Sequence, residues 1–373
     1  MRILFLSPIN SIFLHELSKR LIERCNATIF ILDLFNDVFV NAQDNDIRYI
    51  KVKKKPNRLI RNLLFIKNVI KYRSYIKRAD LKFDICNIHY VDSRYIFIIN
   101  FFKKRIPKLF ASIYGADFYY YKKYKFFLTR ILDKADKITF TNEFMEMNFL
   151  KEFEQYREKT TILHFGLSNL ELLNKFYNDN RTLYKKKLNF PLDKKIVLCG
   201  YSSSPFHQHL KVINSLVKVE TSIWDKVFLV FPMTYGGYAD QVSKVKEALS
   251  HTRFDFAILE NYLSDEDIAS LRFATDIMLN VPVYDQLSGT LQENIFIGNT
   301  VIAGTWLPYK VFDDMGVDYI KVDSIENVGI VLKENIESVR IINKQKNKEI
   351  IWNFSNWDIC LQKWINLYTQ KIS

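Results

Sequence analysis

Cysteine is scarce in this sequence, and the few cysteines do not cluster. The 373 residues include four of them, far apart in the chain: Cys25, Cys86, Cys199 and Cys360. There is no CxxC pair and no Cys/His cluster, so the sequence offers no zinc motif. Such wide spacing also argues against a disulfide framework and is typical of proteins in a reducing cytoplasm.

Long apolar runs are missing as well. No window holds the ~18 or more uncharged apolar residues that a membrane span requires. The start of the chain, Met1–Pro8, is a short apolar run that ends at a polar break and lacks the cleavage site of a signal peptide. We interpret this run as a first β-strand, and we expect a protein that lies on a membrane surface without crossing it.

Acidic residues are in short supply in only one half of the chain. The formal net charge is +13. Residues 1–175 hold 32 Lys or Arg against 18 Asp or Glu, a difference of +14, whereas residues 176–373 hold 22 against 23, a difference of −1. This asymmetry indicates an anionic partner for the first half. A basic solvated surface without any partner would give the same count.

Basic and aromatic residues alternate in several segments of the first half. These segments are Lys51–Lys55, Arg58–Arg73, Phe101–Lys108 and Tyr119–Phe127. Lysine beside aromatic rings suits an anionic bilayer surface, although the rings can also belong to an ordinary domain core. Single-stranded nucleic acid is a rival partner. Because no recognised nucleic-acid motif occurs, we expect no nucleic-acid partner.

Strand-like apolar runs alternate with helix-like segments along the whole chain, which predicts parallel sheets with helical crossovers. The expected strands are Arg2–Ser7, Ala27–Leu34, Asp84–His89, Lys108–Tyr114, Lys137–Thr141, Lys195–Cys199, Lys226–Phe231, Phe254–Leu259, Ile277–Asn280, Thr300–Ala303 and Tyr319–Val322. The expected helices include Ile12–Glu23, Gln241–Leu249, Asp265–Phe273 and the tail Lys344–Tyr368. This length and this alternation predict an α/β protein of two Rossmann-like domains.

A polar, irregular stretch near the middle of the chain, Asn174–Asp193, is the expected linker. It separates a basic domain over residues 1–175 from a second domain over residues 190–345. Residues 346–373 form a helix that we expect to return to the first domain. Ligands of open parallel sheets bind beyond the carboxyl ends of the strands. We therefore expect a deep cleft between the domains, with the site in the loops that follow the strands.

One segment has a pattern suited to a diphosphate. Between Asp285 and Glu293 lies a small-residue turn, Ser288-Gly289-Thr290, which opens a helix. Free backbone N–H groups and the positive end of the helix dipole favour a phosphate at such a turn. A carboxylate within the helix can accept hydrogen bonds from a ribose, and one before the turn can face a sugar. An ordinary loop with a capped helix has the same pattern.

This segment and its surroundings resemble the retaining GT-B glycosyltransferases of the family 4 type. Asp285 and Glu293 match their E-x7-E motif, with Asp in place of the first Glu. Further matches run in family order over most of the chain: Tyr114–Asp117, Leu132–Ile138, Leu263–Ile277, Gly298–Gly304 and Phe354–Trp357. The resemblance implies the GT-B architecture, with an acceptor-binding domain followed by a nucleotide-sugar-binding domain.

Two further segments are similar to a subgroup, the bacterial TDP-N-acetylfucosamine:lipid II N-acetylfucosaminyltransferases. Gly200–Leu210 resembles a loop of that subgroup and Phe231–Gly236 a strand end. Tyr201 and the pair His207-Gln208 depart from the asparagines of the subgroup, so the donor sugar can differ. The chain also lacks the Arg and Lys that family 4 enzymes use on the diphosphate in this loop.

The resemblance implies roles for individual residues. Donor-binding roles fall on Glu293, Ser288, Gly289, Thr290, Gly200, Ser202, His209, Tyr235 and Gly236. Catalytic roles fall on Asp285 and Asp117, and His89 joins them because it ends an apolar strand at the expected cleft. His89 can equally be a structural histidine, His209 a histidine that faces water, and Asp117 a helix cap.

The implied reaction moves a hexose or aminodeoxyhexose from a UDP or dTDP sugar to a lipid-linked glycan, with retention, in bacterial surface polysaccharide synthesis. No DxD-type metal motif is present, so we expect no metal and no cofactor. The enzyme would then be cytoplasmic and peripheral on the inner face of the membrane. A sugar-nucleotide epimerase or hydrolase on the same fold is the alternative. A basic nucleic-acid-binding protein would leave Asp285–Glu293 unexplained.

Overall fold

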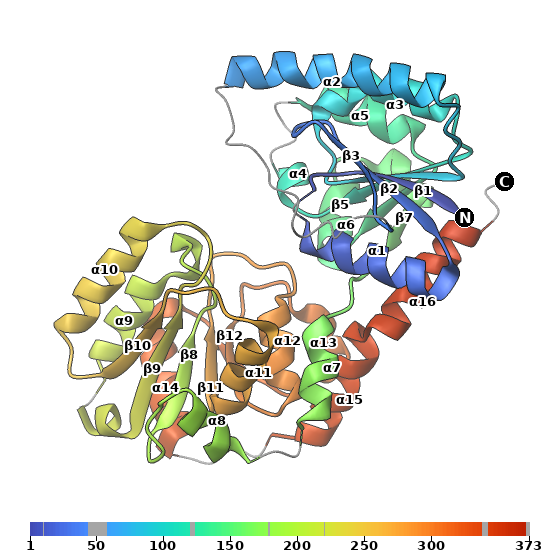
Figure 1. Cartoon of the computed structure of the whole chain (residues 1–373). Helices are drawn as coiled ribbons and strands as arrows, with labels where there is room; N and C mark the ends of the chain where they lie inside the picture. The colour runs from blue at the N-terminus through green and yellow to red at the C-terminus, as the bar shows by residue number, and fades with distance from the viewer. Residues whose placement is uncertain are drawn as a thin grey trace. The chain divides into compact units, whose positions relative to one another are not determined.

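The chain forms two units, each built on one sheet (Figure 1). The computed structural model describes residues 1–9, 11–43, 58–119, 124–177, 180–219, 221–337 and 342–370. The first unit combines Met1–Gly166 with Trp357–Ser373, and the second is the continuous stretch Leu167–Asn356. The chain therefore leaves the first unit after Gly166 and returns to it at Trp357, whereas the sequence led us to expect boundaries at residues 175 and 346.

The stretch expected to be a linker contains helix α8 (Arg181–Lys187). Arg181 Nη1 and Lys185 Nζ lie 2.7 and 2.9 Å from the carboxylate of Asp276, which is largely buried. Polar residues that look like a linker in the sequence are therefore the ion-pair partners of a carboxylate in the second unit. They hold α8 to that unit, where it packs on α11 (Asp265–Ala274).

The sheet of the first unit has the strand order β3-β2-β1-β4-β5-β6-β7. Its strands are β1 (Arg2–Leu6), β2 (Thr28–Asp33), β3 (Val38–Asn41), β4 (Ile85–His89), β5 (Lys108–Ile113), β6 (Lys137–Phe140) and β7 (Thr160–Ile162). Only β3 pairs in the antiparallel direction, on the edge beside β2. The five strands expected in this half are confirmed, whereas β3 and β7 were not predicted.

Alternating residues of β1 face the two layers of helices that cover this sheet. Ile3 and Phe5 pack with α1 (Ile12–Cys25) and α16 (Trp357–Thr369). Leu4 and Leu6 pack on the other side, toward α2, α3, α5 and α6 (Figure 1). Those helices span Arg58–Arg78, Ile96–Lys103, Lys125–Lys134 and Glu143–Leu150, and the short α4 spans Ala116–Tyr119. In the part of the chain described, no helix is long and apolar enough to cross a membrane.

The sheet of the second unit is parallel throughout, in the order β10-β9-β8-β11-β12-β13. Its strands are β8 (Lys195–Cys199), β9 (Val227–Pro232), β10 (Asp255–Leu259), β11 (Ile277–Asn280), β12 (Thr300–Gly304) and β13 (Ile320–Val322). All six strands expected in this half are confirmed. The order is that of a doubly wound sheet, whose direction of winding reverses between β8 and β11.

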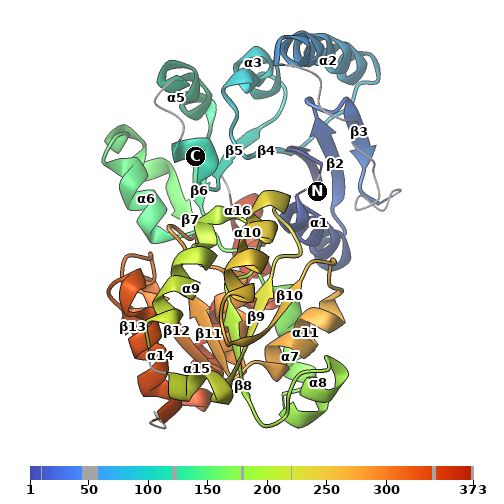
Figure 2. The same ribbon diagram turned by 90° about the vertical axis from the view of Figure 1, so that its left-hand side faces the viewer.

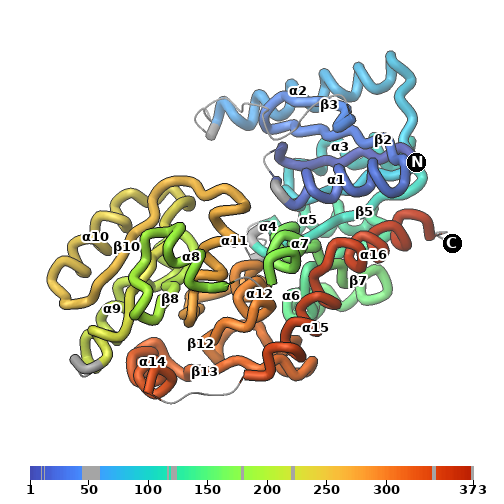
Figure 3. The backbone as a smooth tube through the Cα atoms, turned by 60° about the horizontal axis from the view of Figure 1, so that its bottom comes forward, coloured from blue at the N-terminus to red at the C-terminus, as the bar shows by residue number. Residues whose placement is uncertain are grey.

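Helices cover both faces of the second sheet. On one face lie α9 (His209–Val217), α10 (Ala239–Ser250) and α14 (Val328–Glu337), the first two in front of the sheet in Figure 2. On the other face, α7 (Ser168–Lys175) and α15 (Lys344–Ser355) pack beside α12 (Gly289–Phe296), as Figure 3 shows. The short α13 spans Lys310–Asp314.

The tail of the chain is two helices and not one. Asn356 has extended backbone angles, which end α15 before α16 begins. Trp357 and Trp364 of α16 are buried in the first unit, while Trp352 of α15 packs on the second. The single helix expected over Lys344–Tyr368 is therefore wrong at Asn356, and only its second part belongs to the first unit.

Candidate functional site

Loops that follow three strands of the second sheet carry most of the expected site residues. Gly200 follows β8, Gly236 lies beyond β9, and Asp285–Glu293 comes after β11. Because the carboxyl ends of parallel strands meet at one edge of a sheet, these loops are neighbours. The second unit thereby gathers Gly200, Ser202, His209, Tyr235, Gly236, Asp285, Ser288, Gly289, Thr290 and Glu293, whereas His89 and Asp117 belong to the first unit.

Hydrogen bonds hold the loops after β8 and β9 together. The backbone N–H and the hydroxyl of Ser203 donate to the carbonyl of Tyr235 at 2.8 and 2.7 Å. Gly236 has a φ of +108°, and a Cβ there would lie 2.8 Å from the Ser203 Oγ. Only glycine fits this position without strain. Buried Ser202 accepts a hydrogen bond from the backbone N–H of Ser204 at 3.1 Å, which shapes the same loop.

Asp285 is the point at which several loops of this site meet. Its buried carboxylate accepts hydrogen bonds from the Tyr201 hydroxyl at 3.2 Å, and from the backbone N–H groups of Gln286 and Ser288 at 2.7 and 3.3 Å. The Tyr309 hydroxyl also donates to it. Burial raises the pKa of Asp285 above its ordinary value, and these hydrogen bonds oppose the rise. The carboxylate thus joins the loops after β8 and β12 to the start of α12.

The first turn of α12 begins at Gly289, directly after the cap residue Ser288. Ser288 caps the helix, since its hydroxyl accepts from the backbone N–H of Leu291 at 3.4 Å. The first N–H groups of a helix have no acceptor inside the helix, so those of Gly289 and Thr290 remain for a ligand. Gly289 lies close to Leu167, where a Cβ would meet its Cδ2 at 3.0 Å. A phosphate at this end would gain from both the N–H groups and the helix dipole.

Glu293 lies one helical turn further along and is already paired. Its carboxylate accepts from Arg272 Nε at 2.8 Å and from Asn169 Nδ2 at 3.2 Å. The same guanidinium donates to Thr290 Oγ1 at 3.0 Å. Arg272 and Glu293 are both buried. Arg272 therefore places a guanidinium, paired with Glu293, beside the first turn of α12. Sequence reasoning did not select Arg272. The signal that points to it is a single arginine among the apolar residues at the end of a predicted helix, Leu271–Ala274.

His209 is buried at the start of α9 and does not face water. Gly200 makes room for it, since a Cβ at Gly200 would lie 2.9 Å from the His209 Nε2. Among the described residues, neither ring nitrogen of His209 has a hydrogen-bond partner. Burial lowers the pKa of His209 to about 3 and that of His207 to about 4. Both rings are therefore neutral at physiological pH.

In the first unit, His89 ends β4, and Asp117 lies in α4, which follows the neighbouring strand β5. His89 is buried against Phe5 and Trp364, with its Nδ1 on the Tyr114 hydroxyl. Burial lowers the pKa of His89 to about 3. Its other ring nitrogen, Nε2, has no partner within the described part of the chain.

Asp117 lies in the first turn of the short helix α4, and its hydrogen bonds reach outside that helix. Its carboxylate accepts from the backbone N–H groups of Val91, Tyr114 and Gly115 at 3.0, 3.0 and 2.8 Å. It thereby joins the loop after β4 to the turn after β5. Burial raises the pKa of Asp117 to about 6, against the lowering effect of these three hydrogen bonds.

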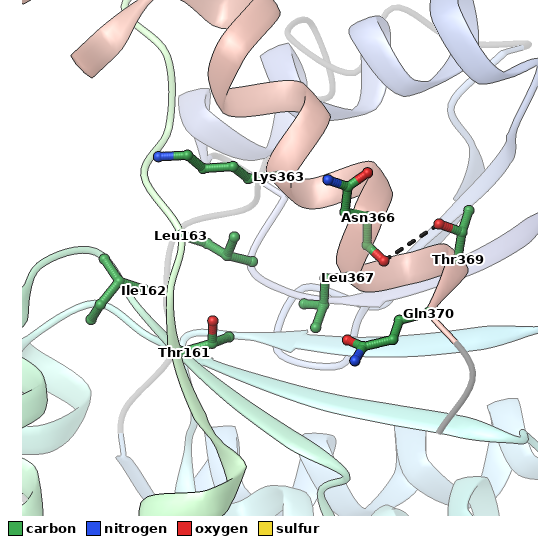
Figure 4. Close-up of a pocket in the computed structure, with 8 residues that line it drawn as sticks. All are labelled: Thr161, Ile162, Leu163, Lys363, Asn366, Leu367, Thr369 and Gln370. Atoms are coloured by element: carbon green, nitrogen blue, oxygen red, sulfur yellow. Dashed lines mark hydrogen bonds between the residues drawn. The ribbon is translucent and has the colours of Figure 1, made fainter. Parts of the chain in front are cut away.

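A groove of about 520 Å³ lies elsewhere in the first unit, between β7 and α16 (Figure 4). It is lined by Thr161, Ile162, Leu163, Lys363, Asn366, Leu367, Thr369 and Gln370. None of the expected site residues takes part, so this groove is separate from the loops described above. Within the described ranges, no group of three or more His, Cys, Asp or Glu side chains is placed to hold a metal ion.

Comparison with known proteins gives matches in structure but not in sequence. No family model and no curated protein sequence matches the chain. A glycosyltransferase from Rickettsia africae aligns at 13% identity over 98% of this chain and 97% of its own, with a TM-score of 0.71. Sucrose-phosphate synthase from Thermosynechococcus elongatus aligns at 13% identity over 99% and 98%, with a TM-score of 0.74. Anabaena HepE, solved in complex with UDP, aligns at 14% identity over 98% and 99%, with a TM-score of 0.69.

These similarities extend over nearly the whole of each chain, through both units. At such low identity they establish the fold. They agree with the strand order of the second sheet, which is doubly wound, and with the parallel core of the first. The chain therefore has the α/β fold of two parallel-sheet units that defines the GT-B glycosyltransferase structures.

Proposed function

We propose that this protein is a glycosyltransferase that takes its sugar from a nucleoside diphosphate donor, a UDP or dTDP sugar. The observation that carries the proposal is the start of α12, where the Asp285 carboxylate accepts from the backbone N–H of Ser288 and the Arg272 guanidinium donates to Thr290. The N–H groups of Gly289 and Thr290 would bind the diphosphate, and Glu293 would reach the ribose. The similar HepE structures contain UDP and UDP-glucose, which supports a donor of this kind.

The same residues suit the chemistry of the leaving group. When the bond between the sugar C1 and the phosphate oxygen breaks, negative charge grows on the diphosphate, and preformed N–H donors and Arg272 stabilise it. The acceptor hydroxyl then attacks the same face of the sugar. Its proton goes to the departing phosphate, so the configuration is retained. This same-face mechanism requires no metal. We infer it from the resemblance of Asp285–Glu293 to the E-x7-E motif of retaining enzymes.

We further propose that the acceptor is a lipid-linked glycan of bacterial surface polysaccharide synthesis, bound by the first unit at the inner face of the cytoplasmic membrane. The excess of basic residues over acidic ones in residues 1–175 supports this acceptor. His89 and Asp117 would lie at the acceptor side of the reaction. The similarity of Gly200–Leu210 to the N-acetylfucosaminyltransferases favours an aminodeoxyhexose as the transferred sugar.

Titration calorimetry with UDP, dTDP, GDP and CMP and their sugars tests the donor. A true donor raises the midpoint of thermal unfolding by mass action, so a thermal-shift series gives the same ranking. We expect UDP or dTDP to bind and the others to bind less well. If none of the nucleotides binds the folded protein, the proposal fails.

One substitution tests the role of α12 directly. Gly289→Pro removes a single N–H at the first helical position, where proline is well tolerated, and Ser288, with a φ of −44° and a ψ of 128°, lies outside the αR region that a following proline disfavours. We expect nucleotide affinity to fall about tenfold. Asp265→Pro is the matched control, because Asp265 opens α11 after its Ser264 cap. Equal affinities in the two variants would exclude a phosphate at α12.

A further inference from the structure

Helix α2 is anchored in the first unit by one face only. Phe65, Val69, Tyr72 and Ile76 are buried there, at the spacing of a single helical face. Asn68 on the same face is also buried, and its Nδ2 donates to the carbonyl of Leu34 at 2.9 Å. This face accounts for the folding of α2, so the remaining apolar residues of the helix need another explanation.

A second face of α2 is an apolar stripe exposed to solvent. Leu59, Leu63, Ile66 and Ile70 follow one another at intervals of four, three and four residues, which places them in one line along the helix. Their exposed fractions are 72%, 63%, 43% and 61%. Single exposed apolar residues are common on protein surfaces, but a continuous row of large ones marks an interaction surface.

The charges around this stripe select the kind of partner. From Arg61 onward, α2 contains no Asp or Glu and has these basic residues: Arg61, Lys67, Lys71, Arg73, Lys77 and Arg78. Arg73 and Lys77 continue the line of the stripe beyond Ile70. Lys71 is neutralised by Asp37 at 2.7 Å. A second copy of α2 would bring like charges together, so the stripe favours an anionic partner over self-association.

Neighbouring helices of the same layer add exposed aromatic rings. Phe97 of α3 and Phe126 of α5 have exposed fractions of 53% and 61%. α3 packs beside α2, and α5 packs on the far side of α3, all on the same side of the first sheet (Figure 2). Lipid bilayers with anionic headgroups accept this combination of apolar side chains, rings and cations.

We propose that the exposed face of α2 docks on an anionic lipid bilayer. Leu59, Leu63, Ile66 and Ile70 enter the boundary between headgroups and acyl chains, while Lys67, Arg73 and Lys77 contact the headgroup phosphates. This surface concerns a different part of the molecule from the donor site, and its test does not depend on the proposed enzymatic activity. The segment Lys51–Lys55, which the sequence also marks as basic, lies outside the described residues.

Vesicle co-sedimentation of the full chain tests the proposal. Vesicles of phosphatidylglycerol and phosphatidylcholine are compared with vesicles of phosphatidylcholine alone, at low and high salt. We expect binding to the anionic vesicles only. Salt should weaken it by screening the charges. Binding to neither kind of vesicle, or equally to both, would overturn the proposal.

Apolar contact is tested by the double variant Leu63→Gln, Ile70→Gln, which keeps every charge of α2. We expect at least about a tenfold loss of affinity for anionic vesicles, because two apolar side chains no longer enter the bilayer. The control is Leu183→Gln, Ile330→Gln, which changes two exposed apolar residues on α8 and α14 of the second unit. Thermal unfolding shows that both variants are folded.

Two results with these variants would overturn the proposal. One is unchanged vesicle binding by the α2 variant. The other is a wild-type dimer in sedimentation that the α2 variant abolishes, since the stripe would then be the contact between two copies. Binding of single-stranded RNA in competition with the vesicles would likewise assign the surface to nucleic acid.

Discussion

Arg272 Nε lies 2.8 Å from Glu293 Oε2, and both side chains are buried in the second unit. The pair joins the end of α11 to the middle of α12, and the guanidinium also reaches Thr290. A buried ion pair is a weak source of net stability, but the loss of one partner leaves a buried charge without compensation. Substitution of Glu293 will therefore change stability as well as any contact with a nucleotide.

Glu293→Ala should lower the free energy of unfolding by about 3–5 kcal/mol, because Arg272 is left unpaired. Chemical denaturation measures this loss. The double variant Arg272→Met, Glu293→Leu replaces the pair with apolar residues and should recover most of the stability. If Glu293 contacts the ribose, nucleotide affinity will stay low in the double variant. Recovery of affinity together with stability would contradict that role.

Tyr309→Phe should lower turnover and also cost about 1–3 kcal/mol of stability, since the buried Asp285 carboxylate loses a donor. Tyr201→Phe removes another donor to the same carboxylate and should act in the same direction. The control is Tyr319→Phe, which keeps the ring that contacts Tyr309 and removes only a hydroxyl that donates to the partly exposed Asp313 at 2.8 Å. A similar loss of turnover in the Tyr319 variant would show that the Asp285 contacts have no special effect.

Gly200→Ala should destabilise the protein more than Gly237→Ala. Both glycines have positive φ, +67° and +75°, so alanine costs about 1–2 kcal/mol at either position. At Gly200 the new Cβ would also lie 2.9 Å from the His209 ring, whereas no atom of the described residues lies within 4 Å of a Cβ at Gly237. Thermal unfolding of the two variants separates the contact from the backbone strain. Equal destabilisation would mean that His209 moves aside easily.

Titration of Asp117 should lower the free energy of unfolding as the pH rises from about 4 to about 6. Its pKa is raised from an ordinary 3.8 to about 6, so between these values the folded state binds more protons than the unfolded state. Protonation of Asp117 makes its whole contribution to stability below pH 3.8, and this contribution is lost as the pH rises through about 6. From pH 4.5 to 6.5 the wild type should lose about 1–2 kcal/mol relative to Asp117→Asn, which does not titrate.

The comparison with Asp117→Asn is needed because buried histidines act in the opposite direction. His89 and His209 have pKa values lowered to about 3, so their contribution is present above an ordinary 6.5 and is lost as the pH falls. Chemical denaturation of both proteins over the pH series removes this common background. A difference that stays constant, or that grows in favour of the wild type, as the pH rises would show that the pKa of Asp117 is not raised in the folded protein.

The sequence predicts the strands of both sheets well because buried parallel strands are short apolar runs with clear ends. Helix α2 is not predicted, since apolar residues occupy both its buried face and its exposed stripe, and no single periodicity stands out. The edge strand β3 is short and only partly buried. A strand of this kind gives no strong apolar signal.

The rule that ligands bind at the carboxyl ends of strands predicts that the expected site residues of the second unit lie in neighbouring loops, as they do. The partners of those residues could not be predicted. Arg272 and Glu293 are separated by 21 positions in the chain, and Tyr309 reaches Asp285 from the loop after another strand. Such pairings depend on how the loops pack, and a single sequence does not show this.

The return of the chain to the first unit at Trp357 has a consequence for biosynthesis. Trp357, Trp364 and Tyr368 fill one face of the first sheet, and a Cβ at Gly166 would lie 2.4 Å from the Trp357 ring. Domains fold as units while a chain is being synthesised. The second unit is continuous, and all of it has been synthesised once the ribosome has reached Asn356. The first unit begins at Met1, but it lacks part of its core until residues 357–370 have been synthesised. The unit that is translated first is therefore the last to close its core.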